Sequence, residues 1–531
     1  MWPLLVLISA DFTTVILETL AFLVIFFLTL SVFNYFSSDV HISIRGFSNK
    51  HNWTQSQLSS KPCYCSVCES LLLTGSGAAC DCCGVHADPG CIRIADKKLK
   101  CKALTSNDRS PMKHHWVKGN LSYDALCAGC DEECESEPGH LDWQCCWCQR
   151  AIHPACEKKV PLECDFGSFQ SMIIPPNSIV VSRKRSVRTN FLLRAVNPPP
   201  WPVWVPLIVV GNRKSGNNDG DIILSYFRRL LNPAQVVDLT TRSPEAALEW
   251  CTLLGERKAN VLVAGGDGTI GWVLNTIEKL QLKCDPPVAI MPLGTGNDLS
   301  RVLGWGKEFA KHVDLSIVLE QILKSSEIPL DRWLVEVSPT RHLGIKLSSK
   351  KIFMYNYFSI GVDAQVALDF HRTRESPFYL FSSRIFNKIL YLGYGTQQAV
   401  ERSCQDLEKR LDLFLDGKKM ELPSIESVVI LNIPSWGAGV HLWTMGDEDI
   451  PEQSISDGKL EVVALFSSFH IAQLQMGLSQ PHRIGQASNI KIVLKSHAAV
   501  QVDGEPWQQP PGVINITFHN QATVLKYEKN S

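Results

Sequence analysis

Two glycine-rich turns, each placed directly after a short apolar run, constrain the fold of this chain most. The first, at 265–269, reads Gly-Gly-Asp-Gly-Thr and follows the run 261–264. The second, at 294–298, reads Gly-Thr-Gly-Asn-Asp and follows the run 288–293. Each is typical of a strand, a tight turn and the start of a helix. This alternation predicts an open α/β sheet with both turns at the carboxyl edge of its strands.

The same turns are suited to bind phosphate, because glycine lets backbone N–H groups approach an anion and a helix N-terminus favours negative charge. Neither turn ends as a Walker A loop does, and neither has the dinucleotide Gly-x-Gly-x-x-Gly pattern. A third polar turn, at 212–216, follows the run 207–210. Two ordinary strand-to-helix turns are the alternative. We expect a bound nucleotide to contact Asn212, Ser215, Gly216, Gly265, Gly266, Gly268, Thr269, Gly294, Thr295, Gly296, Asn297 and Asp298.

Cysteine is concentrated in one block, where 16 of the 19 cysteines lie between Cys63 and Cys164. Eight residues there have the spacing of zinc ligands, which predicts two closed tetrahedral sites stabilising a small domain. A disulfide framework is the alternative, but it has no use for histidines. The eight are His114, Cys127, Cys130, Cys145, Cys148, His153, Cys156 and Cys164.

An imperfect copy of this pattern lies upstream, and both copies begin with His-x-Trp. Asp88 stands where the second copy has its second histidine, and a carboxylate oxygen can bind zinc. His86 is a rival for that position. The other expected ligands of this first copy are His51, Cys65, Cys68, Cys80, Cys83, Cys91 and Cys101.

The N-terminal segment 15–36 approaches the roughly 20 apolar residues that a membrane helix needs. Asp11 and Glu18 limit the span on its N-terminal side, whereas Arg45 and Lys50 lie downstream, so the positive-inside rule puts the rest of the chain in the cytosol. We expect a retained anchor helix. A cleaved signal peptide and a shallow hairpin that does not cross the membrane are the alternatives.

Length and charge set the remaining bounds. A chain of 531 residues implies about three or four domains, and a net charge of −1 argues against nucleic-acid binding. A basic, proline-rich stretch at 182–204 is interpreted as a linker that either contacts anionic lipid or is simply solvated. An α/β domain is expected at 205–329.

The half of the chain at 330–528 is rich in alternating β patterns. Runs at 411–415, 427–433 and 460–466 predict strands of a sandwich, with a hairpin turn at 416–417. Three polar glycine motifs interrupt these strands. They begin at Asn356, Asp457 and Val502.

Taken together, the glycine turns and these three motifs resemble the diacylglycerol kinase family over nearly the whole chain. The resemblance implies phosphorylation of diacylglycerol to phosphatidic acid with ATP and Mg²⁺. Matching phrases at 330–333, 380–384 and 483–487 look most like a membrane-anchored type of this family. That type implies a preference for polyunsaturated (arachidonoyl) diacylglycerol, a role in phosphatidylinositol turnover, and the endoplasmic reticulum or plasma membrane as its location.

The cysteine block resembles a pair of C1 zinc fingers, at 51–101 and 114–164. The resemblance implies that one Zn²⁺ of the second finger is held by His114, Cys145, Cys148 and Cys164, and the other by Cys127, Cys130, His153 and Cys156. C1 fingers that bind diacylglycerol carry a proline and a Gln-Gly that are incomplete in the first copy and missing in the second. We therefore expect both to be structural or autoregulatory modules.

Phosphoryl transfer requires a metal to neutralise phosphate oxygens and a group that accepts the hydroxyl proton. We expect Asp267 to face the γ-phosphate and its Mg²⁺. By resemblance, Asp503 is the general base, supported by Glu505 and Asp331, and Asp457 is a ligand of a structural Mg²⁺. The expected partners are diacylglycerol and membrane lipids. A sphingosine or ceramide kinase and an inactive lipid-binding scaffold are the alternative functions.

Overall fold

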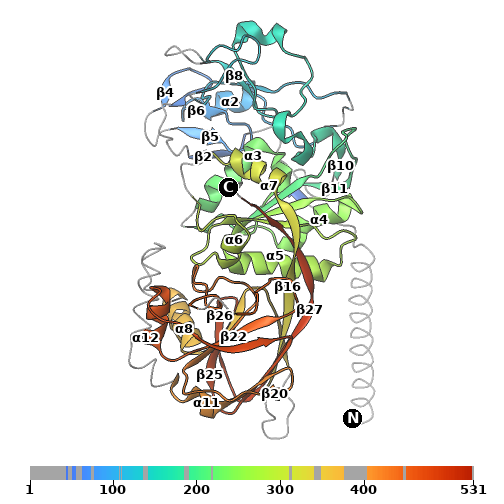
Figure 1. Ribbon diagram of the computed structural model, residues 1–531. Coiled ribbons are helices and arrows are strands. Elements are labelled where there is room, and N and C mark those ends of the chain that lie inside the picture. The colour runs from blue at the N-terminus through green and yellow to red at the C-terminus, as the bar shows by residue number, and fades with distance from the viewer. Residues whose placement is uncertain are drawn as a thin grey trace, which may run out of the picture.

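The structure of the chain is a computed structural model. It describes residues 43–45, 51–55, 63–72, 77–106, 108, 110–122, 124–134, 141–183, 190–216, 219–309, 314–339, 349–375, 404–446 and 450–528. The finger repeats lie at one end, the α/β domain in the middle and a β-rich domain at the other end (Figure 1). The expected anchor at 15–36 lies outside the described residues. Within the described part of the chain, no helix has the length and apolar character needed to cross a membrane.

The α/β domain is built on four parallel strands in the order β13-β12-β14-β15. Their almost continuous apolar sequences are buried on both faces, as a parallel sheet covered by helices requires. Alternate residues face opposite sides: Leu207 and Val209 pack with helices α3 and α7, whereas Ile208 and Val210 pack with α4 and α5. The parallel sheet is therefore confirmed. The elements are β12 (Leu207–Gly211), α3 (Asp219–Leu230), β13 (Val236–Asp238), α4 (Pro244–Leu254), β14 (Asn260–Gly265), α5 (Asp267–Leu280), β15 (Val288–Pro292), α6 (Asp298–Val302) and α7 (Ser316–Lys324).

Two long strands join this domain to the β-rich domain. Strand β16 (Ser326–Pro339) pairs antiparallel with β27 (Gly512–Lys526) along its whole length, and β27 also pairs with β15 through Val288 and Val524. One sheet therefore runs from β13 through β27 to the far end of the molecule (Figure 1). The expected domain boundary at 329 falls inside β16, so the two domains share a continuous backbone ladder.

The β-rich domain is a sandwich of the far part of this sheet and a six-stranded sheet of order β23-β22-β21-β18-β25-β26. The core between them brings together Trp333 of β16, Leu413 of β19 and Val462 of β22. The hairpin at 416–417 is present, with positive φ at both residues. The elements are β17 (Lys350–Met354), β18 (Tyr357–Gly361), α8 (Val362–Glu375), α11 (Leu407–Arg410), β19 (Leu411–Leu415), β20 (Lys418–Lys419), β21 (Ser427–Leu431), β22 (Leu460–Leu465), α12 (Ser468–Gln475), β23 (His482–Ala487), β24 (Asn489–Leu494), β25 (Ala498–Val502) and β26 (Glu505–Gln509).

The interpretation of 182–204 as a linker was wrong for part of that stretch. Strands β10 (Ile179–Arg183) and β11 (Asn190–Val196) pair antiparallel, and β1 (Ser43–Arg45) pairs with β11. Ile179 and Leu193 are buried in the core that α4 covers. Leu193, which lies among the basic residues, and Ile179, which precedes them, supply this packing.

The finger repeats consist of short strands and turns, and they pack directly on the α/β domain. Their elements are β2 (Trp53–Gln55), β3 (Cys63–Tyr64), β4 (Leu71–Leu72), β5 (Ala78–Cys80), β6 (His86–Ala87), α2 (Ile92–Lys98), β7 (Trp116–Lys118), β8 (Trp143–Cys145), β9 (Ala151–Ile152) and the 3-10 turn η1 (Pro154–Lys159). Two further 3-10 turns, η2 (Gly167–Met172) and η3 (Pro176–Ser178), lead into the α/β domain, which contains a fourth, η4 (Pro233–Gln235). One core extends from Trp147 and Phe166 to Phe227 of α3.

Candidate active site and zinc centres

The two glycine turns at the carboxyl edge of the sheet lie against each other. A Cβ added to Gly266 would lie 2.9 Å from the Cα of Gly294, and a Cβ added to Gly294 would lie 2.7 Å from the Cα of Gly266. No side chain fits between backbones that approach this closely, so both positions require glycine. The predicted convergence of these two turns is present.

Asn297 shapes the second turn. Its φ of 53° is left-handed, and its Oδ1 accepts from the Gly294 N–H at 2.8 Å. Its Nδ2 donates to the carbonyl oxygens of Gly294 and Lys307 at 3.0 and 2.9 Å. The amide therefore holds the loop closed from inside, whereas Thr295 at its tip is exposed.

Asp267 is the first residue of α5, and its carboxylate reaches the start of α6. It accepts from the backbone N–H groups of Asp298 and Leu299, both at 3.2 Å. Burial, with a further contribution from the charge of Asp298, raises the pKa of Asp267 to about 6. The side chain thus couples the two glycine turns and lies at the centre of the sheet edge.

Asp298 connects the α/β domain to the sandwich. Its carboxylate accepts from the Ser435 hydroxyl and from the backbone N–H groups of Ala438 and Gly439, at 3.2 and 3.1 Å. Both carboxylate oxygens therefore fasten the 435–439 loop, which gives Asp298 a role in holding the domains together.

Asp503 enters the site from the sandwich, on the turn between β25 and β26. Its φ is 49°, and its carboxylate accepts from three successive backbone N–H groups, of Tyr355 and Asn356 at 2.8 Å and of Tyr357 at 3.0 Å. Those donors favour the ionised form, but burial outweighs them and, together with the charge of Asp267, raises the pKa of Asp503 to about 7.

Asn356 was not predicted as a site residue, yet it lies between these two carboxylates. Its backbone binds Asp503, and its side-chain amide donates to the carboxylate of Asp267. Asn356 is 3% exposed, and its Oδ1 has no hydrogen-bond partner among the described residues. A buried polar atom without a partner is costly, so this oxygen is suited to a bound ligand. The available signal was a polar residue directly after a strand and before an aromatic pair.

Glu505 lies at the rim of the same site. A Cβ added to Gly268 would lie 3.5 Å from its Oε1, so this exposed carboxylate lies beside the first turn of α5. Gly265, by contrast, packs directly against the side chain of Thr269.

The third polar turn follows β12, whose Gly211 pairs with Ala264 of β14, so it lies at the same sheet edge. Asn212 Oδ1 accepts from the Lys214 N–H at 2.9 Å, and Ser215 N donates to the Asn212 carbonyl oxygen at 2.9 Å. Gly216 has a φ of 65°. These hydrogen bonds therefore fix the conformation of the turn before α3 begins.

Asp331 lies with Asp457 rather than with Asp267 and Asp503. It is fully buried and accepts from the Gly458 N–H at 2.7 Å and from Gln521 Nε2 at 2.8 Å. Burial raises its pKa, and the charge of Asp457 adds to this effect. Oxygen donors of this kind suit a hard cation such as Mg²⁺.

The second finger assembles the two ligand sets that its resemblance implied. His114, Cys145, Cys148 and Cys164 form one group with ligand atoms within 4.8 Å of one another, and Cys127, Cys130, His153 and Cys156 form the other. Sulfur and imidazole nitrogen in tetrahedral sets of four are the preferred ligands of structural zinc. The structure brings the eight predicted ligands of this finger together in the two interleaved sets.

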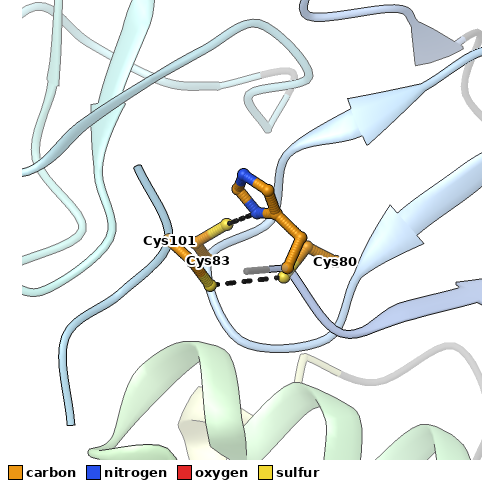
Figure 2. A group of neighbouring side chains, drawn as sticks. Cys80, Cys83 and Cys101 are labelled. Carbon is orange, nitrogen blue, oxygen red and sulfur yellow. Dashed lines mark hydrogen bonds between the residues drawn. The ribbon is translucent and has the colours of Figure 1, made fainter. Parts of the chain in front are cut away.

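The first finger forms one complete set, of His51, Cys80, Cys83 and Cys101 (Figure 2). His51 Nδ1 lies 3.2 Å from Cys83 Sγ, and the sulfurs of Cys80 and Cys101 are 3.7 Å apart.

The second set of the first finger gathers the thiols of Cys65, Cys68 and Cys91. The backbone N–H of Asp88 donates to Cys65 Sγ at 3.4 Å. The carboxylate of Asp88 accepts from the Gly90 N–H. The rival His86 binds the Gly84 carbonyl oxygen through Nδ1.

Comparison with known proteins agrees with this architecture. Residues 206–332 match the family Diacylglycerol kinase catalytic domain, 353–506 match the Diacylglycerol kinase accessory domain, and 114–167 match the Phorbol esters/diacylglycerol binding domain (C1 domain).

Several curated proteins are similar over most of the chain. Diacylglycerol kinase 2 of Arabidopsis thaliana is 32% identical over 90% of this chain and 84% of its own length. Probable diacylglycerol kinase 3 of Caenorhabditis elegans is 36% identical over 88% of this chain, and diacylglycerol kinase iota of Homo sapiens is 31% identical over 91%. The chain spans 63% of the nematode protein and half of the human one. A crystal structure of a diacylglycerol kinase from Bacillus anthracis aligns with 61% of this chain and 96% of its own, at 16% identity and a TM-score of 0.35.

Proposed function

Because the chain belongs to the diacylglycerol kinase family, we propose that it transfers the γ-phosphoryl group of ATP to the free hydroxyl of a 1,2-diacylglycerol, giving phosphatidic acid and ADP. The observation that carries this proposal is the meeting of Asp267 and Asp503, from two different domains, across Asn356. The hydroxyl oxygen bonds to the γ-phosphorus, the bond from that phosphorus to the ADP oxygen breaks, and the hydroxyl proton passes to a carboxylate.

Asp503 is the carboxylate best suited to take that proton. A general base works best when its pKa lies near the working pH, and the pKa of Asp503 is about 7. Its three backbone donors fix its orientation. Glu505, at the rim of the site, assists Asp503 in accepting the proton.

The glycine turns bind the ATP phosphates through backbone N–H groups. Mg²⁺, when bound, neutralises charge on the phosphate oxygens, and Asp267 together with the unpartnered Oδ1 of Asn356 would hold it. A second Mg²⁺, with a structural role, fits Asp457 and Asp331.

The lipid substrate requires access to a bilayer. Four large apolar side chains on and beside α12 are exposed: Phe466 by 43%, Phe469 by 64%, Met476 by 68% and Leu478 by 70%. We propose that this apolar surface of the sandwich contacts the membrane, with the segment 15–36 as an anchor and the catalytic domains on the cytosolic side. The endoplasmic reticulum and the plasma membrane are the expected locations.

The finer identity is also a proposal. The phrases at 330–333, 380–384 and 483–487 support the epsilon type, and with it a preference for arachidonoyl diacylglycerol and a role in phosphatidylinositol turnover. The fingers act as zinc-dependent structural modules, because they are packed into the core of the α/β domain.

An assay with γ-labelled ATP and a panel of diacylglycerol, sphingosine and ceramide, separated by thin-layer chromatography, tests this function. Label in phosphatidic acid alone is the expected result. Label in a sphingoid lipid would favour the alternative kinase, and no transfer to any lipid by folded protein would favour an inactive scaffold.

A further inference from the structure

A cavity lies where the two finger repeats meet the C-terminal end of helix α3. Its volume is about 80 Å³, which is enough for several waters or one small tetrahedral ion. Its walls come from three parts of the molecule: His86 of the first finger, Asn120, Gln144 and Gln149 of the second finger, and Arg229 of α3 are among the lining residues.

The guanidinium of Arg229 is a cation in this wall that has no hydrogen-bond partner among the residues the structure describes. Its Nε is buried without a partner, and none of its nitrogens forms a hydrogen bond or ion pair with any residue that the structure describes. A buried N–H that lacks a partner costs about 1–3 kcal/mol, and more when it carries charge.

The neighbouring cations are satisfied, which sets Arg229 apart. Arg228 pairs with Asp81 of the first finger at 2.8 Å. Lys102 is 3% exposed and donates to the carbonyl oxygens of Arg229 and Leu231, at 2.6 and 2.8 Å. These contacts fix the end of α3 against the fingers and hold the cavity in shape.

The rest of the wall is already ordered and lacks a carboxylate. Asn120 exchanges two hydrogen bonds with the backbone of Tyr64, at 2.7 and 2.9 Å. Gln144 donates to the Gln149 carbonyl oxygen, and Gln149 to that of Cys146, both at 3.1 Å. Among the described residues, none that lines the cavity is acidic. A preformed pocket with one free guanidinium and no carboxylate selects an anion over a cation.

We propose that this cavity binds a small oxyanion of the phosphate class, held by the N–H groups of Arg229 at the junction of both fingers and α3. The planar fork of a guanidinium matches two oxygens of a phosphate, which gives geometric specificity as well as charge. Inorganic phosphate and the phosphomonoester headgroup of a lipid present the same oxygens. The site is separate from the catalytic centre and does not depend on the proposed reaction.

Equilibrium dialysis of the zinc-loaded full chain against radiolabelled inorganic phosphate tests the site. The control is Arg257→Gln, which removes an exposed arginine elsewhere. We expect wild type and this control each to bind one phosphate more per chain than Arg229→Gln does. Arg229→Lys keeps the charge without the fork and is expected to bind at least about tenfold more weakly than wild type.

Circular dichroism establishes that each variant is folded, and Arg229→Lys carries the test if Arg229→Gln is not. A soluble short-chain phosphatidic acid is then added as a competitor for the phosphate that wild type binds and Arg229→Gln does not. Competition identifies a lipid headgroup as the ligand, and lack of competition identifies free phosphate. Equal phosphate binding by wild type, Arg229→Gln and Arg229→Lys would overturn the proposal.

Discussion

At the scale of single residues, the account depends on the protonation of Asp503. A general base acts when it is deprotonated, so kcat/KM should rise as the pH rises through about 7, the pKa of this carboxyl. We expect Asp503→Asn to lose at least about a hundredfold in turnover and to lose this limb of the pH profile. The initial rate at which labelled phosphatidic acid forms, measured between pH 5 and 9, reports both effects.

The same pKa shift predicts a change in stability of known sign. Because the folded-state pKa lies above the ordinary value, Asp503 contributes stability below about pH 4, and this contribution is lost as the pH rises through 7. Denaturant unfolding of Asp503→Asn should therefore depend less on pH in this window than wild type. An unchanged pH dependence would mean that the carboxyl titrates normally.

Asn356 provides a second test at this scale. Asn356→Ala removes both the donor to Asp267 and the unpartnered oxygen, so we expect turnover to fall at least about tenfold and the Mg²⁺ concentration for half-maximal rate to rise. Asn356→Asp retains an oxygen ligand and should recover part of the Mg²⁺ affinity. A variant with unchanged Mg²⁺ dependence would limit Asn356 to a role in packing.

The sequence indicated most of the residues that the fold brings together at the site. Asp267 and Asp503 were predicted from their motifs, whereas Asn356 was overlooked because its importance comes from an unpaired oxygen that only the fold reveals. Asp298 was predicted to contact nucleotide, yet its carboxylate binds the 435–439 loop. Such partners lie more than a hundred residues away in the chain, beyond the reach of local pattern.

At the scale of elements, the exposed apolar side chains on and beside α12 provide a test of membrane contact. Phe469→Ser together with Met476→Ser should reduce activity on diacylglycerol in vesicles severalfold, because insertion of apolar side chains contributes to membrane binding. Activity in detergent micelles should change little. Leu323→Ser, which alters an exposed apolar residue on α7, is the control. Equal losses in vesicles for both variants would argue against a specific surface at α12.

Strand positions were predicted well where apolar residues alternate or run continuously, as at β12, β14, β15 and β19. Strands β16 and β27 were not anticipated as a pair, because their pairing joins residues almost two hundred positions apart. Strands β10 and β11 were hidden by the basic residues around them.

At the scale of the whole molecule, the fingers and the α/β domain behave as one packed unit. Lys102 donates to the last carbonyl groups of α3 from a fully enclosed position. Lys102→Met removes the charged donor from those carbonyl oxygens, so we expect a loss of about 2–3 kcal/mol in the free energy of unfolding. Lys98→Met, at an exposed position, is the control and should have little effect. Thermal unfolding measures both; similar melting temperatures for both variants would mean that the contact adds little.

Sequence reasoning treated the fingers as separate modules, because zinc spacing predicts a self-contained domain and says nothing about its surface. Docking depends on Asp81, Lys102 and Trp147, none of which is a ligand. Because the fingers and the α/β domain share one core, we expect zinc loss to destabilise the catalytic half as well.

The central claim is that Asp267 and Asp503, from different domains, form one phosphoryl-transfer centre. The most direct measurement is turnover of diacylglycerol by Asp267→Asn, Asp503→Asn and the double variant, each shown to be folded. We predict that each single variant loses at least about a hundredfold and that the double variant is little worse than the weaker single one, since groups that act as a unit are strongly non-additive. Near-normal turnover of either folded single variant at any pH would contradict the account.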